Sequence, residues 1–256
     1  MSFDWNGKFR VCGMERSGST FVWQVLRELG CDVVKSHSYD AQDALSVKLY
    51  TYRDPRDVIC SYARTVLAPE VKRGELSDIN SITGMSGELL RVAAYRLFYR
   101  PNARQLDYRC YVWEANQGAP ICFIKYEDYF NGNEATLVGG ISHFVSQFQE
   151  VKMDANLFNM IAKKYSKDKN AKRASAFDSF DEWDNETQIH GNHITNGGST
   201  WRDDFNWGVA VCVDKHLGDF LIELEYEKDR SWILDFMPKN DLYSEQMIDM
   251  INNKGS

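Results

Sequence analysis

The sequence predicts an α/β protein with a mostly parallel central sheet flanked by helices. Strand-like and helix-like segments alternate along the chain with short connections, an order typical of parallel sheets that helices cover on both faces. The 256 residues, 43% of them hydrophobic, suit one such domain with a sizeable core. We therefore expect a single domain over residues 1–256.

The individual elements follow from apolar periodicity and from turn and cap residues. The predicted strands cover 8–14, 31–36, 47–53 and 120–126. The predicted helices cover 19–29, 56–67, 134–149, 155–165 and 203–226, and 85–116 reads as one long helix or as two helices around Pro101. Asp54 is the candidate N-cap of the helix over 56–67, and Pro55 suits its first position.

Two segments lack such periodicity. Residues 166–200 are polar, with a basic run followed by an acidic one. A connection this long is commonly a functional lid or a disordered segment, and we expect a lid or acceptor-binding loop here. Residues 237–256 are expected to form a peripheral tail.

Composition excludes several classes of protein. The net charge of −7 argues against nucleic-acid binding through bulk electrostatics. The six cysteines are scattered without metal-ligand spacing, which indicates reduced thiols and no zinc site. The sequence shows no signal-peptide pattern and no run of eighteen apolar residues. A cytoplasmic protein without a membrane partner is the expectation.

The stretch GMERSGST, residues 13–20, nearly matches a phosphate-binding loop. Gly13, Gly18 and Thr20 stand where that motif has its glycines and hydroxyl, but Ser19 stands where it has lysine, and Arg16 is the loop's cation. A strand that enters a glycine-bearing loop and then a helix presents backbone N–H groups to an anion. The alternative is an ordinary capped helix start.

Two further motifs follow predicted strands. Arg53 ends the strand over 47–53, and Ser61 lies eight positions later on the next helix, so both side chains could hold one phosphate. His37 follows the strand over 31–36, with Lys35 nearby, at the sheet edge where ligands gather in open α/β folds. The alternatives are an N-capped helix with surface ion pairs and a solvent-facing loop histidine.

Together these residues resemble the sulfotransferase family that uses 3′-phosphoadenosine 5′-phosphosulfate (PAPS). The family's phosphosulfate loop is similar to Arg16–Phe21, its 3′-phosphate motif to the residues from Arg53 to Ser61, and its catalytic triplet to Lys35-Ser36-His37. Tyr126-Glu127-Asp128 and the NGGSTWR segment at 196–202 resemble two supporting motifs. The resemblance covers roughly residues 9–205 in the family's order and implies its P-loop-like fold.

The resemblance also implies a reaction. PAPS is the expected donor and 3′-phosphoadenosine 5′-phosphate (PAP) the product, with no metal and no nucleic-acid partner. The acceptor is a hydroxyl or amine of a small metabolite or of a glycan or lipid precursor. His37 is the implied general base, and Arg16 and Lys35 stabilise charge. The implied cofactor-binding residues are Arg16, Ser17, Gly18, Ser19, Thr20, Phe21, Arg53, Ser61, Tyr126, Gly197, Gly198, Trp201 and Arg202.

Four departures from the family pattern limit what can be carried over. Arg16 replaces the usual lysine, and Phe21 replaces the tryptophan that stacks on adenine. The interval between the loop and His37 is short, so acceptor preferences of the small-molecule enzymes do not transfer. The C-terminal Arg-Lys-Gly triplet is missing, and Gly197, Gly198, Arg202 or the basic run are its candidate replacements.

Two other functions stay open on the sequence. One is a kinase-like P-loop protein that uses ATP and Mg²⁺, against which Ser19 in the lysine position argues. The other is a nucleotide-binding module without catalysis, which the presence of both His37 and Arg16 disfavours.

Overall fold

The computed structural model of the chain describes residues 5–37, 39, 45–74, 86–100, 107–130, 132–179, 181–191 and 200–238. The chain packs as two compact units, and each unit is built from two separate stretches of sequence. Residues 1–53 and 102–196 make up the first unit, and residues 54–101 and 197–256 make up the second. Whether these units act as one domain stays a prediction.

The first unit contains a four-stranded parallel sheet, which confirms the expected fold class. Its strands follow the order β2-β1-β3-β4. They are β1 (Phe9–Gly13), β2 (Val33–Lys35), β3 (Val47–Tyr52) and β4 (Ile121–Lys125). The register places Lys35 beside Val11 and Thr51 beside Gly13. The carboxyl ends of β1, β2 and β3 therefore lie at one edge, where ligands bind in this class of sheet.

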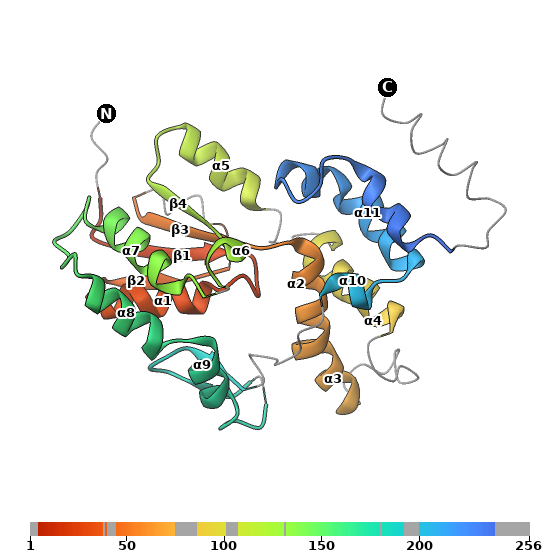
Figure 1. The fold of residues 1–256 in the computed structure, drawn as a ribbon, viewed down its shortest axis with the longest axis horizontal. Helices are drawn as coiled ribbons and strands as arrows, with labels where there is room; N and C mark the ends of the chain where they lie inside the picture. The colour runs from red at the N-terminus through yellow and green to blue at the C-terminus, as the bar shows by residue number, and fades with distance from the viewer. Residues whose placement is uncertain are drawn as a thin grey trace. The chain divides into compact units, whose positions relative to one another are not determined.

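Helices cover both faces of this sheet (Figure 1). On one face lie α1 (Ser19–Glu28), α7 (Glu134–Val145) and α8 (Ala155–Lys164). Val22 and Leu26 of α1 are fully buried against strand residues such as Val11 and Leu49. The other face packs against α5 (Tyr108–Asn116), where the rings of Tyr50 and Tyr111 lie 4.7 Å apart. Burial on both faces favours strands that are largely apolar, and in β3 the polar side chains of Lys48 and Thr51 are buried as well.

Shorter elements complete the first unit. Helix α6 (Tyr126–Tyr129) follows β4 directly. The segment that the sequence left without periodicity contains α9 (Lys167–Ala174) and an antiparallel hairpin of β5 (Trp183–Asp184) and β6 (Ile189–His190). Helix α9 is polar along most of its length, so it carries no apolar stripe for a sequence pattern to detect.

The described part of the second unit is helical. Helix α2 (Pro55–Tyr62) continues through a π-helical turn (Ala63–Leu67) into α3 (Ala68–Lys72), so the predicted helix runs five residues longer. Helix α4 (Gly87–Ala94) likewise continues into a π-helical turn (Tyr95–Tyr99). The other elements are α10 (Trp201–Asp204), α11 (Trp207–Glu223) and a 3₁₀ helix (Arg230–Phe236).

The single helix predicted over 203–226 is interrupted after α10. Phe205 is extended, with ψ 142°, and the Asn206 side chain accepts a hydrogen bond from Val209 N–H at 3.0 Å. Asn206 therefore caps a new helix, a local preference that competes with helix continuation. Among the described helices of the whole chain, none is long and apolar enough to cross a membrane.

The second unit is organised around a buried arginine. Arg56 is only 2% exposed, and its guanidinium lies 3.8 Å from the Trp201 ring and 4.8 Å from the Trp232 ring. Asp54 accepts hydrogen bonds from Arg56 Nε at 2.9 Å and from Arg56 Nη2 at 2.7 Å. Glu227 forms a second ion pair with Arg56. The ion pair at the start of this helix is thus buried, and Arg56 joins the start of α2 to Trp201 of α10.

Replacing Arg56 by alanine should destabilise this unit strongly. The change leaves the buried Asp54 carboxylate without its cation, and breaking such a pair costs about 3–5 kcal/mol. Arg202→Ala is the matched control, because the exposed Arg202–Asp235 pair at 2.9 Å should contribute at most about 1 kcal/mol. Urea unfolding, followed by circular dichroism and tryptophan fluorescence, measures the free energy of unfolding of both variants. Equal losses in the two variants would contradict the buried-pair assignment.

Candidate functional site

The loop that joins β1 to α1 is attached to strand β3 at its base. Met14 N–H donates to Thr51 O at 2.9 Å. Gly13 has φ 127°, and a Cβ at this position would lie 2.0 Å from Thr51 O. Only glycine permits both this backbone conformation and this approach. The first glycine of the motif is therefore required by the sheet, whether or not an anion binds.

Ser17 fixes the same loop from the inside. Its side chain is fully buried, and its hydroxyl lies 2.7 Å from Thr51 Oγ1 and donates to the Met14 carbonyl. A hydroxyl has one proton to donate, and here a backbone oxygen accepts it. The Ser17 side chain thus serves the loop's conformation, and its expected contact with a cofactor stays a prediction.

Gly18 and Phe21 belong to a second packing contact of the loop. Gly18 has φ 88° and precedes helix α1, and a Cβ there would lie 2.6 Å from the Phe130 ring. Phe21 is 6% exposed and packs edge-on against Phe130, with ring centroids 5.4 Å apart. Phe21 is part of the core, and its stacking on adenine stays a prediction.

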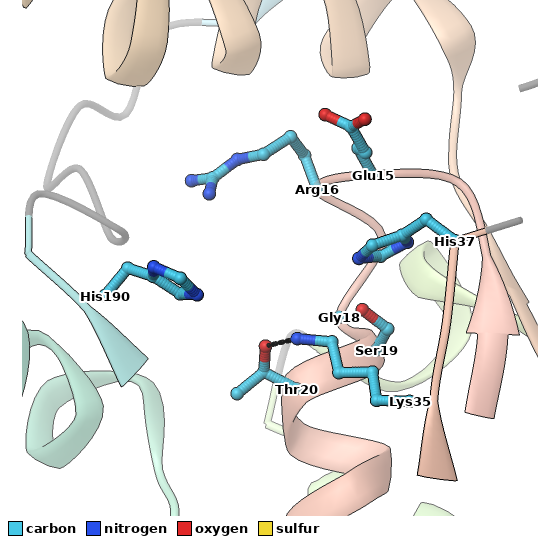
Figure 2. Close-up of a pocket in the computed structure, with 8 residues that line it drawn as sticks. All are labelled: Glu15, Arg16, Gly18, Ser19, Thr20, Lys35, His37 and His190. Atoms are coloured by element: carbon cyan, nitrogen blue, oxygen red, sulfur yellow. Dashed lines mark hydrogen bonds between the residues drawn. The ribbon is translucent and has the colours of Figure 1, made fainter. Parts of the chain in front are cut away.

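A cavity of about 280 Å³ opens at this edge of the sheet. Figure 2 shows its lining, in which cationic, imidazole and hydroxyl side chains face one another. The lining residues are Glu15, Arg16, Gly18, Ser19, Thr20, Lys35, His37 and His190. The carboxylate of Glu15 is directed away from Thr20 and Lys35 in this view. Two cations beside a helix N-terminus make the cavity suitable for an anion.

Arg16 stands at the tip of the loop in a strained backbone conformation. Its φ is 62°, in the left-handed region that costs a non-glycine residue about 1–2 kcal/mol. Burial, with the positive charge of Arg53, lowers the pKa of Arg16 to about 10. Arg16 therefore stays charged at neutral pH, although its surroundings disfavour the charge. An anion in the cavity would relieve that repulsion.

Lys35 reaches the start of helix α1 from the end of β2. Its Nζ donates to Thr20 Oγ1 at 2.7 Å (Figure 2). Burial, followed by the charge of Arg16, lowers the pKa of Lys35 to about 8. The structure thus brings together the loop cation and the lysine that the sequence analysis selected from separate motifs.

His37 is oriented by the end of strand β1. Its Nδ1 lies 3.1 Å from Gly13 O. A carbonyl can only accept, so this contact makes Nδ1 the N–H donor and leaves Nε2 as the acceptor of the neutral ring. This tautomer is the one that a general base needs, because its unprotonated nitrogen can accept a substrate proton.

The segment after His37 is held by a buried polar cluster. Tyr39 OH donates to Glu114 Oε1 at 2.8 Å, and Tyr39 N–H donates to Asp107 Oδ2 at 3.0 Å. Glu114 in turn pairs with the buried Lys48 of β3, with an Nζ–Oε2 distance of 3.0 Å. Helix α5 and strand β3 therefore hold Tyr39, two residues after His37.

Arg53 and Tyr126 lie together at the ends of β3 and β4. The Arg53 guanidinium lies 4.3 Å from the centroid of the Tyr126 ring, and Tyr126 stacks on Phe130 at 4.5 Å and 14°. Arg53 Nη1 also donates to Arg16 O at 3.4 Å. Tyr126 thus positions Arg53 beside the loop, and direct contact of either residue with a nucleotide stays a prediction.

The other predicted residues belong to the second unit. Ser61 lies on α2. Trp201 is 6% exposed and packs on Arg56, and Arg202 lies 4.3 Å from the Trp201 ring. Gly197 and Gly198 lie outside the described residues. The shared phosphate contact of Arg53 and Ser61 stays a prediction, as do the cofactor contacts of Trp201 and Arg202.

The sequence analysis missed His190. This residue lines the cavity from strand β6, about 150 residues after His37 in the chain. A two-residue strand carries no periodic signal, so only the fold relates it to the loop. Across the described ranges, no group of three His, Cys, Asp or Glu side chains is placed to hold a metal ion.

Comparison with solved structures found a likeness to a crystal structure of retinol dehydratase in complex with androsterone and the inactive cofactor PAP. The likeness has a TM-score of 0.56 and 15% sequence identity, and it covers 85% of this chain and 81% of the other. At this identity it shows a shared fold alone. No protein-family model and no curated protein sequence matches the chain.

The low pKa of Lys35 predicts how anion binding depends on pH. A bound anion favours the charged ammonium, so affinity should be constant below about pH 8 and fall by up to about tenfold per pH unit above it. Inorganic sulfate is a suitable probe, since it stays a dianion over this range. Calorimetric titration at pH 7 and pH 9 measures the change.

Lys35→Met should weaken sulfate binding at pH 7 and remove most of this pH dependence. Lys152→Met is the control, since Lys152 is exposed and pairs with Asp154, and it should behave like the wild type. The same pH slope in the wild type and in Lys35→Met would show that Lys35 does not face the bound anion.

Proposed function

We propose that the protein is a sulfotransferase that moves the sulfuryl group of PAPS to a hydroxyl or amine of a small metabolite or of a glycan or lipid precursor. The observation that carries this proposal is the arrangement in one cavity of Arg16, Lys35 and His37. Two fixed cations suit a transferring sulfuryl group and a departing phosphate. An imidazole whose Nε2 carries no proton suits removal of the acceptor proton.

The contact of Lys35 with Thr20 favours this reaction over ATP- and Mg²⁺-dependent phosphoryl transfer. In P-loop kinases and ATPases the equivalent hydroxyl holds Mg²⁺. Here an ammonium lies 2.7 Å from Thr20 Oγ1, and a second cation at that oxygen would be repelled. The charge that a metal provides in those enzymes is supplied by a side chain in this arrangement.

The fold neighbour gives independent support for the donor. That crystal structure contains PAP, which is the nucleotide that PAPS leaves after sulfuryl transfer. It also contains androsterone, a small organic molecule. The same fold therefore accommodates the expected nucleotide product in another protein, while the residues proposed here come from this chain's own cavity.

The proposed roles follow the geometry of the cavity. His37 Nε2 accepts the proton of the acceptor as its oxygen or nitrogen forms a bond to sulfur. The bond between sulfur and the bridging phosphate oxygen breaks in the same step, and its electron pair stays on that oxygen. Arg16 and Lys35 stabilise this charge, while backbone N–H groups at Ser19 and Thr20 hold the phosphate. When bound, PAPS supplies the activated sulfuryl group.

Incubation with PAPS labelled in its sulfuryl group tests the proposal directly. A hydroxylated-metabolite extract serves as the acceptor mixture, and mass spectrometry follows the label. A parallel incubation with ATP and Mg²⁺ tests the kinase alternative. Label transfer from PAPS is expected, whereas phosphoryl transfer that requires Mg²⁺ would replace the proposal.

His37→Ala should lower the turnover of this transfer by about 10²–10⁴-fold, because it removes the general base. PAP affinity should change little, since the cations and the loop remain. His143→Ala on the exposed surface of α7 is the control and should keep wild-type turnover. Wild-type turnover in His37→Ala would show that another group removes the proton.

Arg53 is proposed to bind the 3′-phosphate of the donor, together with the expected contribution of Ser61. The wild type should then bind PAP more tightly than adenosine 5′-phosphate. Arg53→Ala should bind PAP about 10- to 100-fold more weakly, since this is the typical contribution of a charge-assisted hydrogen bond. Arg27→Ala on α1 is the control. Equal affinity of the wild type for the two nucleotides would contradict this role.

A further inference from the structure

His190 faces the anion cavity from the hairpin formed by β5 and β6. It lines the same space as Arg16 and Lys35, and Figure 2 shows its imidazole directed into that space. Strand alternation explains the direction: Ile189, its neighbour, is 1% exposed and packs inward, so His190 points to the opposite side. No motif of the resemblance includes this histidine.

The hairpin is attached to the helix that carries the loop. Gln24 lies one helical turn after Thr20 and is 1% exposed. Its Nε2 donates to Thr187 O at 2.8 Å, three residues before His190. Its Oε1 accepts from Asn170 Nδ2 of α9 at 3.1 Å. One buried amide therefore ties α1 to both the hairpin and α9.

The hairpin itself is held in a defined conformation. Thr187 Oγ1 donates to Asp184 Oδ2 at 2.6 Å, and Glu186 N–H donates to Asp184 Oδ1 at 2.9 Å. Gly191 N–H donates to Glu182 O at 2.9 Å, and a Cβ on Gly191 would lie 2.1 Å from Ser179 O. The turn and the exit of the hairpin are thus both fixed around His190.

We infer that His190 is an oxyanion-binding residue of this cavity, and that Gln24 is the residue that positions it. An imidazole N–H donates to a sulfuryl or phosphoryl oxygen that Arg16 and Lys35 hold from the other walls. Residues 183–190 therefore form a fixed wall of the site rather than a lid. The inference deepens the proposed function and depends on it only for the identity of the anion.

Imidazole NMR tests the inference without an activity assay. The chain has five histidines, and substitution of each one assigns its ring signals in protein labelled with ¹⁵N-histidine. Inorganic sulfate and PAP are the two probes. The His190 signals should move with the same apparent Kd as those of His37, while His143 on the exposed face of α7 serves as the internal control.

The outcomes separate the two proposals. If sulfate moves the His190 signals and PAP does not bind, the inference holds and the proposed donor is wrong. If either probe moves His37 and leaves His190 unchanged, the inference is overturned while the proposed function stands. His190→Gln should bind sulfate about tenfold more weakly, and His143→Gln should bind it as the wild type does.

Gln24→Met tests the positioning role, because it keeps the size of the side chain but removes both hydrogen bonds. The His37 signals should still respond to sulfate, while the His190 response should be lost or should occur at a higher Kd. An unchanged His190 response in a folded Gln24→Met protein would overturn the role of Gln24. If this variant does not fold, the His190→Gln titration still decides whether His190 binds the anion.

Discussion

The burial of two cations around one cavity is the constraint on which the site depends. Burial lowers the pKa of both Arg16 and Lys35, and a neighbouring cation adds to it, Arg53 for Arg16 and Arg16 for Lys35, so the folded chain holds these charges against their preference. Between pH 8 and about 10.5, Lys35 is protonated in the unfolded chain but largely neutral in the folded chain. The stability of the ligand-free protein should therefore rise with pH in that window. The affinity for an anion, in contrast, should fall as the pH rises through the same window. The fold thus accepts a local loss of stability that a bound anion reverses, a pattern typical of functional sites.

That constraint explains how the loop divides its residues between structure and chemistry. Gly13, Ser17 and Gly18 contact strand β3 and the Phe130 ring, so they hold the backbone in place. Arg16, Ser19 and Thr20 line the cavity. Arg16 and Lys35 carry like charges, so their interaction does not hold the loop in shape. Rigid packing against β3 and α6 performs this task, and it leaves the residues facing the cavity available for a ligand.

The strands could be predicted from sequence because their signals are local, and so could the position of Arg16, Lys35 and His37 around one cavity. All four predicted strands of the sheet exist, and parallel pairing brings Lys35 and His37 to the loop because Lys35 ends the neighbouring strand β2 and His37 follows it. His190 and Gln24 could not be predicted, since a two-residue strand and a single buried amide have no periodicity. The burial of Arg56 could not be predicted either, because only the tertiary fold brings two tryptophans onto its guanidinium. Likewise, Asn206 interrupts a helix whose apolar pattern continues across it.

The arginine in the loop is compatible with the proposed chemistry because the leaving group needs charge rather than a proton. The 5′-phosphate of PAP has a second pKa near 6, like other phosphate monoesters, so at neutral pH it departs largely as a dianion. Arg16 remains protonated, given a pKa of about 10, and can stabilise that dianion without donating a proton to it. The only proton that must move is the one on the acceptor, and His37 is oriented by Gly13 O to receive it on Nε2. Proton transfer and charge stabilisation are thus assigned to different side chains, and a lysine at position 16 would add a donor that the reaction does not require.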